Sequence, residues 1–544
     1  MRFVRPRRPE TVTLWVTLYF LLFCNMAFWS RLISIQAPDS AGGWLYIGAA
    51  FVFIALVFNL VLTLLAVRFI FKPVVTVLLL ITPFVVYFMN QYGVFINDDM
   101  IRNTFQTDPR EVFDLLSFKL LLYVLLLGVL PLWLLWRTPV RYRPWLRELG
   151  SKLVVILLSF AILAGIAYGF YKDFASTFRN NRELAYLLTP MNYIKASSKY
   201  LKGNARLQPV VIQKIGEDAH REVGQGARKM VTVLVVGETA RAANFGLDGY
   251  ERDTTPELAK VKDLVNFSQF TSCGTDTAVS VPCMFSGLER KNYDADAARR
   301  HEGLLDVVQR AGVPVWWRDN QSGCKGACDR VPNETMIATR FAQETPGLCE
   351  SGECHDDILL AGLKEYIDEL KGDGLIVLHM MGSHGPAYYK RYPKAFEIYT
   401  PVCNTNQLDK CESQAIVNVY DNTIRYTDHV LAKLIALLQK EEGRADTAMW
   451  YLSDHGESLG EHGLYLHGTP YMLAPSGQTH VPSVLWTSAG YRQQLGLEQQ
   501  CLQEVAGKPA SQDNLFHSML GLLQVKTKVY NPALDLFAAC RRPG

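Results

Sequence analysis

A threonine, a glutamate and an aspartate–histidine pair give this sequence its clearest candidates for chemistry. Thr277 lies in the run SCGTDTAVSVPC, Glu238 in GETAR far upstream, and Asp454 and His455 in SDHGE far downstream. Zinc takes carboxylate oxygen and imidazole nitrogen as ligands, and a catalytic zinc keeps one position for the reacting group. A metal there would lower the pKa of the Thr277 hydroxyl and make it a nucleophile. The four residues therefore predict a metal-activated site for phosphoryl transfer, with Thr277 as catalytic residue and fourth ligand.

The residues around Thr277 also suit phosphate binding. The run PCMF that follows permits a helix beginning at Thr277, and a helix N-terminus favours anions. A disulfide between Cys273 and Cys283 would hold this turn rigid.

Further polar side chains lie in loops expected near the same place. His384 in GSHGP and His467 in LHG could bind a second metal or the substrate phosphate, with a structural role as the alternative for each. Lys325 in CKGAC could hold a phosphate oxygen as a point charge, or be a solvated loop lysine. Glu457, two residues after His455, is a weaker substrate candidate.

The elements that must position these residues follow from the apolar runs after residue 230. Four short β-branched runs predict buried strands of a mostly parallel sheet: Val231–Val236, Val313–Trp317, Leu375–His379 and Met449–Leu452. Helical stretches lie between them, for example Asp356–Leu370 and Gln414–Gln439, so the fold class expected here is α/β. In open α/β sheets the site lies beyond the carboxyl ends of the strands, where Glu238, His384 and the Asp454–His455 pair are expected to meet.

The first third of the chain is apolar enough to enter a membrane. Five segments approach the length of about 20 residues that spans a bilayer: Thr13–Ile33, Trp44–Val67, Val74–Tyr92, Phe118–Trp136 and Leu153–Tyr171. The first has no small-residue cleavage pattern and precedes further spans, so we expect it to be retained rather than removed as a signal peptide. The sequence predicts a five-helix membrane domain.

Charges in the loops predict the orientation. Basic residues lie in the N-terminal segment and in the loops after spans two and four, whereas the loop between spans three and four is acidic. The positive-inside pattern places the N-terminus in the cytoplasm, so an odd number of spans places the rest of the chain outside. The expected division is a transmembrane domain over 1–172, an amphipathic connector over 173–230 and a catalytic domain over 231–544, with an ordinary packed linker helix as the alternative for the connector.

The cysteines agree with an outer, oxidising compartment. Cys24 lies within span one and is expected to be a buried small hydrophobe. The other ten suggest a disulfide framework. The close pairs are Cys273–Cys283, Cys324–Cys328, Cys349–Cys354 and Cys403–Cys411, which leaves Cys501 and Cys540, whose pairing with each other stays open. A zinc cluster at Cys349, Cys354 and His355 is the disfavoured alternative, because closed thiolate sites belong to reducing compartments.

Composition excludes one class of partner. The formal net charge is only +3 over 544 residues. A charge this small gives no support to nucleic-acid binding. Lipids of the membrane are the expected partners.

Five motifs in order resemble one known family. VGETAR, CGTDTAVSVPCMFS, WRDN, GSHGP and SDHGESLGE are similar to motifs of the lipid A phosphoethanolamine transferases. That family includes the mobile colistin-resistance proteins and belongs to the alkaline phosphatase/sulfatase superfamily. The resemblance covers nearly the whole chain, with five spans in the bacterial inner membrane and a periplasmic catalytic domain.

The resemblance implies a reaction and a set of site residues. Thr277 would take phosphoethanolamine from phosphatidylethanolamine, releasing diacylglycerol, and pass it to a phosphate of lipid A. Glu238, Thr277, Asp454 and His455 match the site of one zinc ion. His384 and His467 match a second metal or substrate position, and Lys325 a substrate contact. In the acidic loop, Asn103 and Thr107 match weaker lipid head-group contacts.

The expected consequence is a cell that attracts cationic peptides less, because an added amine reduces the negative charge of lipid A. We therefore expect polymyxin resistance. We also expect the enzyme to act as a monomer. One departure from the family is Asp276, where its members carry a small residue.

Rival interpretations share parts of this pattern. A sulfatase needs a C/S-x-P-x-R motif, and SVPCM lacks the arginine. Transfer to a sugar of the lipopolysaccharide core, or glycerol-phosphate transfer as in lipoteichoic acid synthases, would use the same fold. A catalytically silent membrane sensor is disfavoured by the intact set of Glu238, Thr277, Asp454 and His455.

Overall fold

The computed structural model describes residues 6–36, 38, 40–107, 112, 115–181, 183–205, 212–222, 227–350 and 352–542. Contacts divide the chain into two units, each considered by itself. One contains Met1–Ile101 and Leu116–Lys202, and the other contains Arg102–Leu115 and Gly203–Gly544.

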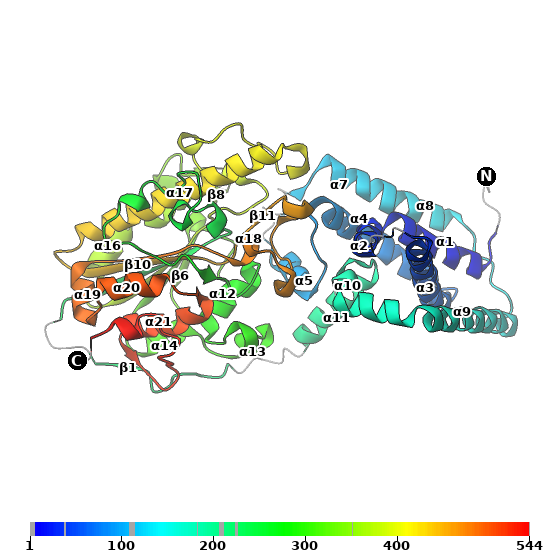
Figure 1. Ribbon diagram of the computed structural model, residues 1–544, viewed down its shortest axis with the longest axis horizontal. Helices are drawn as coiled ribbons and strands as arrows, with labels where there is room; N and C mark the ends of the chain where they lie inside the picture. Colours follow the sequence, from blue (N-terminus) through cyan, green and yellow to red (C-terminus); the bar gives the residue numbers. More distant parts are fainter. Residues whose placement is uncertain are drawn as a thin grey trace. The chain divides into compact units, whose positions relative to one another are not determined.

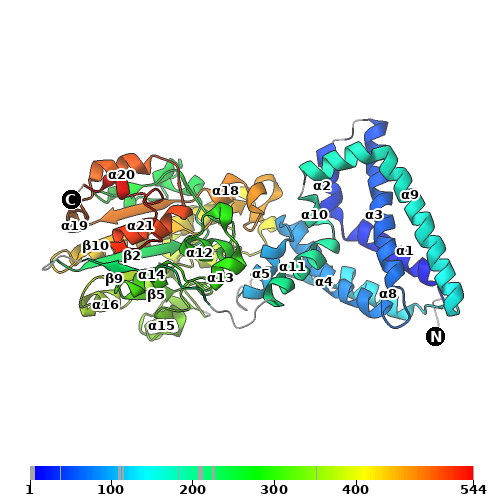
Figure 2. The ribbon, with the colours of Figure 1, turned by 90° about the horizontal axis from the view of Figure 1, so that it is seen from below.

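The first unit is helical and apolar. Four helical segments are long and apolar enough to cross a membrane: α3 (Ala41–Leu65), α4 (Phe71–Tyr92), the continuous helix α7–η1–α8 (Phe118–Arg137) and the Trp145–Phe174 part of α9 (Trp145–Asn180). Helix α9 bends at Phe170 (Figure 2). Short helices α10 (Leu184–Leu187) and α11 (Met191–Ala205) follow it. These positions agree with spans two to five of the sequence prediction.

The first predicted span is not one straight helix. It consists of α1 (Pro9–Phe23) and α2 (Met26–Gln36), which meet at 62°. The buried Asn25 stabilises the break, because its amide donates to the carbonyls of Phe20 and Thr189 and its oxygen accepts from the Thr189 N–H. Cys24 beside it is buried and is the one cysteine of the described chain without a disulfide. Within the described residues, the unit therefore has four helices that are long and apolar enough to cross a membrane, or five if the bent pair is one span.

A seven-stranded sheet forms the centre of the second unit (Figure 1). Its order is β3 (Val265–Asn266), β13 (Ser483–Thr487), β10 (Asp446–Ser453), β2 (Met230–Gly237), β9 (Gly374–His379), β5 (Val315–Asp319) and β6 (Asn333–Thr335). Neighbours from β10 to β6 are parallel, and β13 is antiparallel to both of its neighbours. All four predicted strands lie in this sheet.

Side chains that alternate between the two faces of the sheet contribute to two hydrophobic cores. In β2, Val231, Val233 and Val235 face one cluster, and Leu234 and Val236 face the other. Every residue of β2 is buried because helices cover both faces. Figure 1 shows α17 (Ser413–Lys440) on one face and α12 (Thr277–Ser286), α14 (Leu304–Arg310) and α21 (Leu515–Leu522) on the other. The α/β prediction is confirmed.

One predicted helix differs from the structure. The segment 356–370 consists of a 3₁₀ helix, Asp356–Leu360, and α16 (Leu363–Glu369). Gly362 between them has φ of 71°, which a continuous helix does not allow.

Five disulfides join ten cysteines: the four close pairs predicted from the sequence, and Cys501 with Cys540, whose pairing the sequence left open. The Cys349–Cys354 disulfide leaves no thiolates there for a zinc cluster.

A half-buried carboxylate near the edge of the sheet predicts a pH-dependent stability. Burial raises the pKa of Asp248 to about 6. Between about pH 4 and pH 6 the folded state therefore binds more protons than the unfolded state, so this group's contribution to stability falls as the pH rises. We expect Asp248→Asn, which can still accept from Asn266, to be more stable than the wild type at pH 7.5 by about 1–2 kcal/mol, allowing for solvent screening. Unfolding at pH 4 and pH 7.5 tests this, and an equal difference at both values would contradict it.

Candidate active site

Strand register brings two of the predicted ligands together. Glu238 directly follows β2, and Asp454 directly follows β10, where Ser453 pairs with Gly237 in parallel register. The Asp454 N–H donates to the Gly237 carbonyl at 2.9 Å. Two carboxylates from residues more than 200 positions apart are therefore adjacent at the carboxyl edge of the sheet.

Thr277 reaches the same edge as the first residue of α12. Its Oγ1 lies 3.1 Å and 3.2 Å from the two Glu238 carboxylate oxygens and 3.3 Å from His455 Nε2. Glu238 and His455 are fully buried, and Thr277 is nearly so. The structure thus places the predicted nucleophile against two predicted ligands.

The donor atoms fit a metal ion. One ligand atom from each of Glu238, Asp454 and His455 lies within 4.8 Å of the others. His455 Nδ1 is 2.9 Å from the Gly456 carbonyl, which makes Nδ1 the protonated nitrogen and leaves Nε2 as the ligand atom. Asp454 Oδ2 is buried and has no hydrogen-bond partner among the described residues. A buried carboxylate oxygen in this position fits a cation, and the N and O donors fit zinc.

The pKa shifts of the three candidate ligands also fit a bound cation. Burial favours the neutral form of Glu238, but the hydrogen bond and charge of His455 hold the pKa of Glu238 well below its ordinary value. Burial, with the charge of Glu238, raises the pKa of Asp454 to about 7. Burial alone would lower the pKa of His455, but Asp454 and Glu238 raise it to about 10. Without a metal, protons compensate the paired carboxylates, and a bound cation would displace them.

Two loop histidines and Glu457 extend the site. The His467 ring centroid lies 4.4 Å from that of His455 and 6.0 Å from that of His384. His467 Nδ1 lies 3.3 Å from Oε1 of Glu457, whose other oxygen accepts from the Tyr388 hydroxyl at 3.0 Å. His384, His467 and Glu457 therefore cluster beside the metal-ligand set.

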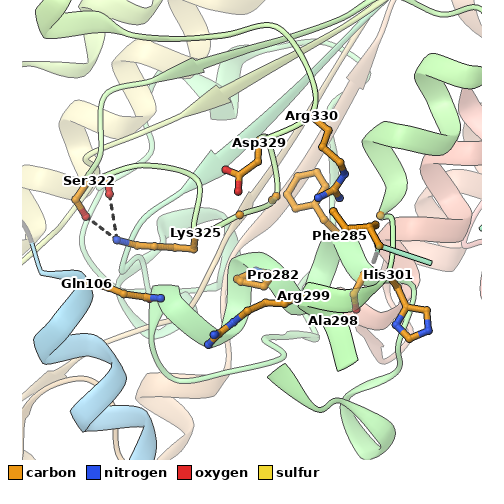
Figure 3. A pocket seen from close by; sticks show the side chains of 15 residues that line it. Gln106, Pro282, Phe285, Ala298, Arg299, His301, Ser322, Lys325, Asp329 and Arg330 are labelled. Atoms are coloured by element: carbon orange, nitrogen blue, oxygen red, sulfur yellow. Dashed lines mark hydrogen bonds between the residues drawn. The ribbon is translucent and has the colours of Figure 1, made fainter. Parts of the chain in front are cut away.

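Lys325 lies in the loop that follows β5. Its Nζ donates to Ser322 Oγ at 2.9 Å, and both residues line a cavity of about 550 Å³ (Figure 3). Pro282 of α12, Arg299 and Arg330 also line it. The cavity is lined by the later part of α12 and not by Thr277. Lys325 is connected to the candidate active site through Ser322 and Gln321, which donates to Glu238.

Asn103 and Thr107 belong to a separate segment of the second unit. The Thr107 hydroxyl donates to the Asn103 carbonyl at 2.6 Å at the end of α5 (Asp98–Gln106). Gln106, between the two, lines the cavity that contains Lys325.

Sequence reasoning missed two amides that connect the loops of the site. Gln321, just after the WRDN motif, donates to Glu238 Oε2 at 2.8 Å. Gln512 donates to the carbonyls of Ser453 and Asp454 at 2.8 Å and 2.7 Å and accepts from the Cys273 N–H at 2.7 Å. The Gln512 amide therefore ties the nucleophile's turn to the end of β10. No local pattern marks either glutamine, although the motif before Gln321 indicated the right loop.

Asp276, the residue that departs from the family pattern, has a structural role. It is the N-cap of α12, with its carboxylate accepting from the Val279 N–H at 3.1 Å. Aspartate suits this position because it satisfies an orphan N–H and its charge opposes the positive end of the helix dipole. A small residue that lacks an acceptor would lose this side-chain bond and leave the Val279 N–H only the Asp276 backbone carbonyl, at 3.2 Å.

We expect Asp276→Ala to lower the free energy of unfolding by about 1 kcal/mol through loss of this cap. Asp276→Asn, which keeps an acceptor oxygen, should stay close to the wild type. Thermal unfolding of the three proteins measures this, and equal losses in both variants would contradict the capping role.

Comparison with known proteins identifies the class and then the family. The α/β unit is of the sulfatase type, because the sulfatase family model matches residues 231–525. The model described as phosphoethanolamine transferase EptA/EptB matches residues 54–205. Phosphoethanolamine transferase EptA of Salmonella typhimurium is 44% identical over 543 residues, 99% of this chain and 98% of its own. Phosphatidylethanolamine transferase Mcr-1 of Escherichia coli is 39% identical over 490 residues, 88% of this chain and 90% of its own.

A solved structure agrees over the whole chain. The integral membrane protein lipooligosaccharide phosphoethanolamine transferase A (EptA) from Neisseria meningitidis has a TM-score of 0.94 and 39% identity, and the match covers 99% of this chain and 100% of that one. The chain belongs to the EptA/Mcr family of phosphoethanolamine transferases. It is therefore an enzyme of the transferase class, as the motifs predicted.

Proposed function

We propose that this enzyme transfers phosphoethanolamine from phosphatidylethanolamine to a phosphate of lipid A, through a phosphoethanolamine–Thr277 intermediate. The observation that carries the proposal is the Thr277 hydroxyl, held 3.1 Å from Glu238 and 3.3 Å from His455 at the N-terminus of α12. A buried hydroxyl at this position in a phosphoethanolamine transferase has a clear chemical use as nucleophile.

The proposed steps balance as two substitutions at phosphorus. The Thr277 oxygen bonds to the phosphorus of phosphatidylethanolamine while the bond to the glycerol oxygen breaks. Diacylglycerol leaves with the proton that Thr277 gives up. An oxygen of the lipid A phosphate then bonds to the same phosphorus, the bond to Thr277 breaks, and the Thr277 oxygen takes up the proton that the lipid A phosphate hydroxyl gives up. The α12 N-terminus favours the phosphate charge in both steps.

Zinc is the proposed cofactor at this site. Glu238, Asp454 and His455 would hold it beside Thr277, where it would supply a lowered hydroxyl pKa and charge neutralisation. We propose one zinc ion there and leave a second open. His384, His467 and Glu457 are the candidate groups for that second ion or for the substrate, with Lys325, Asn103 and Thr107 as further substrate contacts.

The proposed location follows from the lipid substrates. Apolar helices keep the enzyme in the inner membrane, and we propose a cytoplasmic N-terminus with the α/β domain in the periplasm, where five disulfides are stable. Both lipids then reach the enzyme within the membrane, and a monomer suffices for the chemistry. The added amine would lower the negative charge of lipid A and hence its attraction for polymyxin.

Mass spectrometry of lipid A and core from a polymyxin-sensitive Gram-negative host tests the acceptor. Expression of the wild type should add phosphoethanolamine to lipid A and raise polymyxin resistance, and the Thr277→Ala protein should do neither. A modification found only on the core would contradict the lipid A assignment and favour the core-sugar alternative.

A further inference from the structure

The Gln321 side chain contacts the candidate metal site without being one of its predicted ligands. It lies in the turn after β5, is 6% exposed, and donates from Nε2 to Glu238 Oε2 at 2.8 Å. Glu238 Oε1 accepts separately from the Thr239 hydroxyl at 2.6 Å. Each carboxylate oxygen therefore has its own fixed donor besides Thr277, and together these donors set the plane of the carboxylate.

The orientation of the Gln321 amide is determined by its neighbours. Its Oε1 accepts from the N–H of Ser322 and from Ser322 Oγ, the latter at 2.6 Å. A backbone N–H can only donate and a carboxylate can only accept, so the carbonyl must face Ser322 and the NH₂ must face Glu238. A flipped amide would put a donor against a donor and an acceptor against an acceptor.

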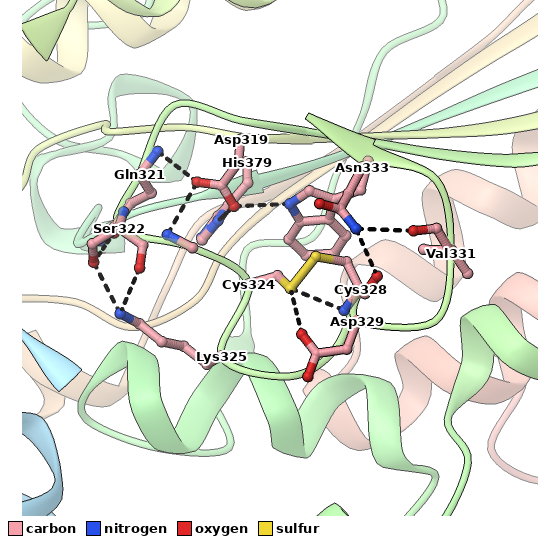
Figure 4. The surroundings of a disulfide bond; sticks show 12 residues. Asp319, Gln321, Ser322, Cys324, Lys325, Cys328, Asp329, Val331, Asn333 and His379 are labelled. Carbon is pink, nitrogen blue, oxygen red and sulfur yellow. Dashed lines mark hydrogen bonds and ion pairs between the residues drawn. A yellow bond between two sulfur atoms is a disulfide. The ribbon is translucent and has the colours of Figure 1, made fainter. Parts of the chain in front are cut away.

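The turn itself is firmly held (Figure 4). The Gln321 N–H donates to Asp319 Oδ1 at 2.9 Å, and Asp319 Oδ2 accepts from Trp317 Nε1 at 2.9 Å and lies 3.0 Å from His379 Nδ1. On the cavity side, Lys325 Nζ donates to Ser322 Oγ. The hydrogen bonds thus run in one direction, from the Lys325 ammonium through Ser322 and Gln321 to the Glu238 carboxylate.

We propose that Gln321 is a positioning residue, which holds the Glu238 carboxylate in the plane that binds zinc and receives the Thr277 hydroxyl. This inference rests on the proposed zinc site. Donors that orient a ligating carboxylate are worth about 10- to 100-fold in metal affinity or activity. Loss of the amide would leave one oxygen of Glu238 without its fixed donor and free the carboxylate to rotate.

The test compares Gln321→Met with the wild type, because methionine has the length of glutamine but no comparable donor. In the full-length protein in detergent, we expect the zinc dissociation constant, measured by competition with a chelator, to rise about 10- to 100-fold. The kcat should fall while KM for phosphatidylethanolamine changes little. The metal-free variant should unfold within about 4 °C of the metal-free wild type, as loss of one hydrogen bond permits.

Two further variants complete the test. Gln321→Asn keeps an amide on a shorter side chain and should fall between wild type and Gln321→Met. Gln503→Met removes a surface amide that donates to the Leu264 carbonyl and should leave zinc affinity unchanged. A folded Gln321→Met with wild-type zinc affinity and kcat would overturn the positioning role alone. A wild type that binds no zinc would overturn the proposed zinc site and this role with it.

Discussion

Replacing Thr277 by alanine is expected to lower transferase activity by about 10³-fold or more. The substitution removes the one hydroxyl among the described residues that lies against both Glu238 and His455, and no covalent intermediate can then form. The fold should survive, because alanine is tolerated at the first position of a helix. Initial rates with purified protein and phosphatidylethanolamine measure the effect.

Two variants make this result specific. Thr277→Ser keeps a hydroxyl and should retain measurable activity. Thr271→Ala removes an exposed threonine hydroxyl whose partner is the Ala510 carbonyl, and should act like the wild type. Full activity in folded Thr277→Ala would remove the nucleophile from the proposal and revive a direct transfer between the two lipids.

Replacing Glu238 by glutamine is expected to empty the proposed zinc site as well as to stop turnover. The substitution removes one of two buried carboxylates and leaves an amide facing the Gln321 amide. Removing a residue that hydrogen-bonds to a metal ligand lowers metal affinity by about 10- to 100-fold. Removing the ligand itself should lower zinc affinity by more than that. Elemental analysis of the purified protein should find zinc in the wild type and little in the variant.

A matched control separates ligand loss from charge loss. Glu344→Gln makes the same chemical change at an exposed position that pairs with Arg340, and should keep both zinc and activity. Zinc retained at wild-type stoichiometry in Glu238→Gln would contradict the assignment of Glu238 as a ligand.

The main features of the fold could be predicted because burial on both faces is visible in sequence. Strands β2, β9 and β10 are continuous apolar runs, and their ends locate Glu238 and Asp454. Strands β3 and β6 are two and three residues long and carry no such signal. The break at Asn25 depends on Thr189, 164 residues away, so periodicity alone predicted an unbroken span.

The site was predictable where the residue chemistry was distinctive, and strand ends helped to place Glu238 and Asp454. Residue types that bind zinc or attack phosphate single out Glu238, Thr277, Asp454 and His455. Gln321 has no such chemistry of its own, and its importance follows from a side-chain contact across two loops. The capping role of Asp276, in contrast, was within reach of the sequence, because a helix start was expected at Thr277 and aspartate is a favoured N-cap.

Peptide mass spectrometry after incubation with phosphatidylethanolamine alone tests the central claim most directly. With no acceptor present, the peptide that contains Thr277 should carry phosphoethanolamine, and lipid A added afterwards should remove it. The Thr277→Ala protein should carry no adduct. An unmodified Thr277 in a preparation that releases diacylglycerol and modifies lipid A, or an adduct on another residue, would contradict the account.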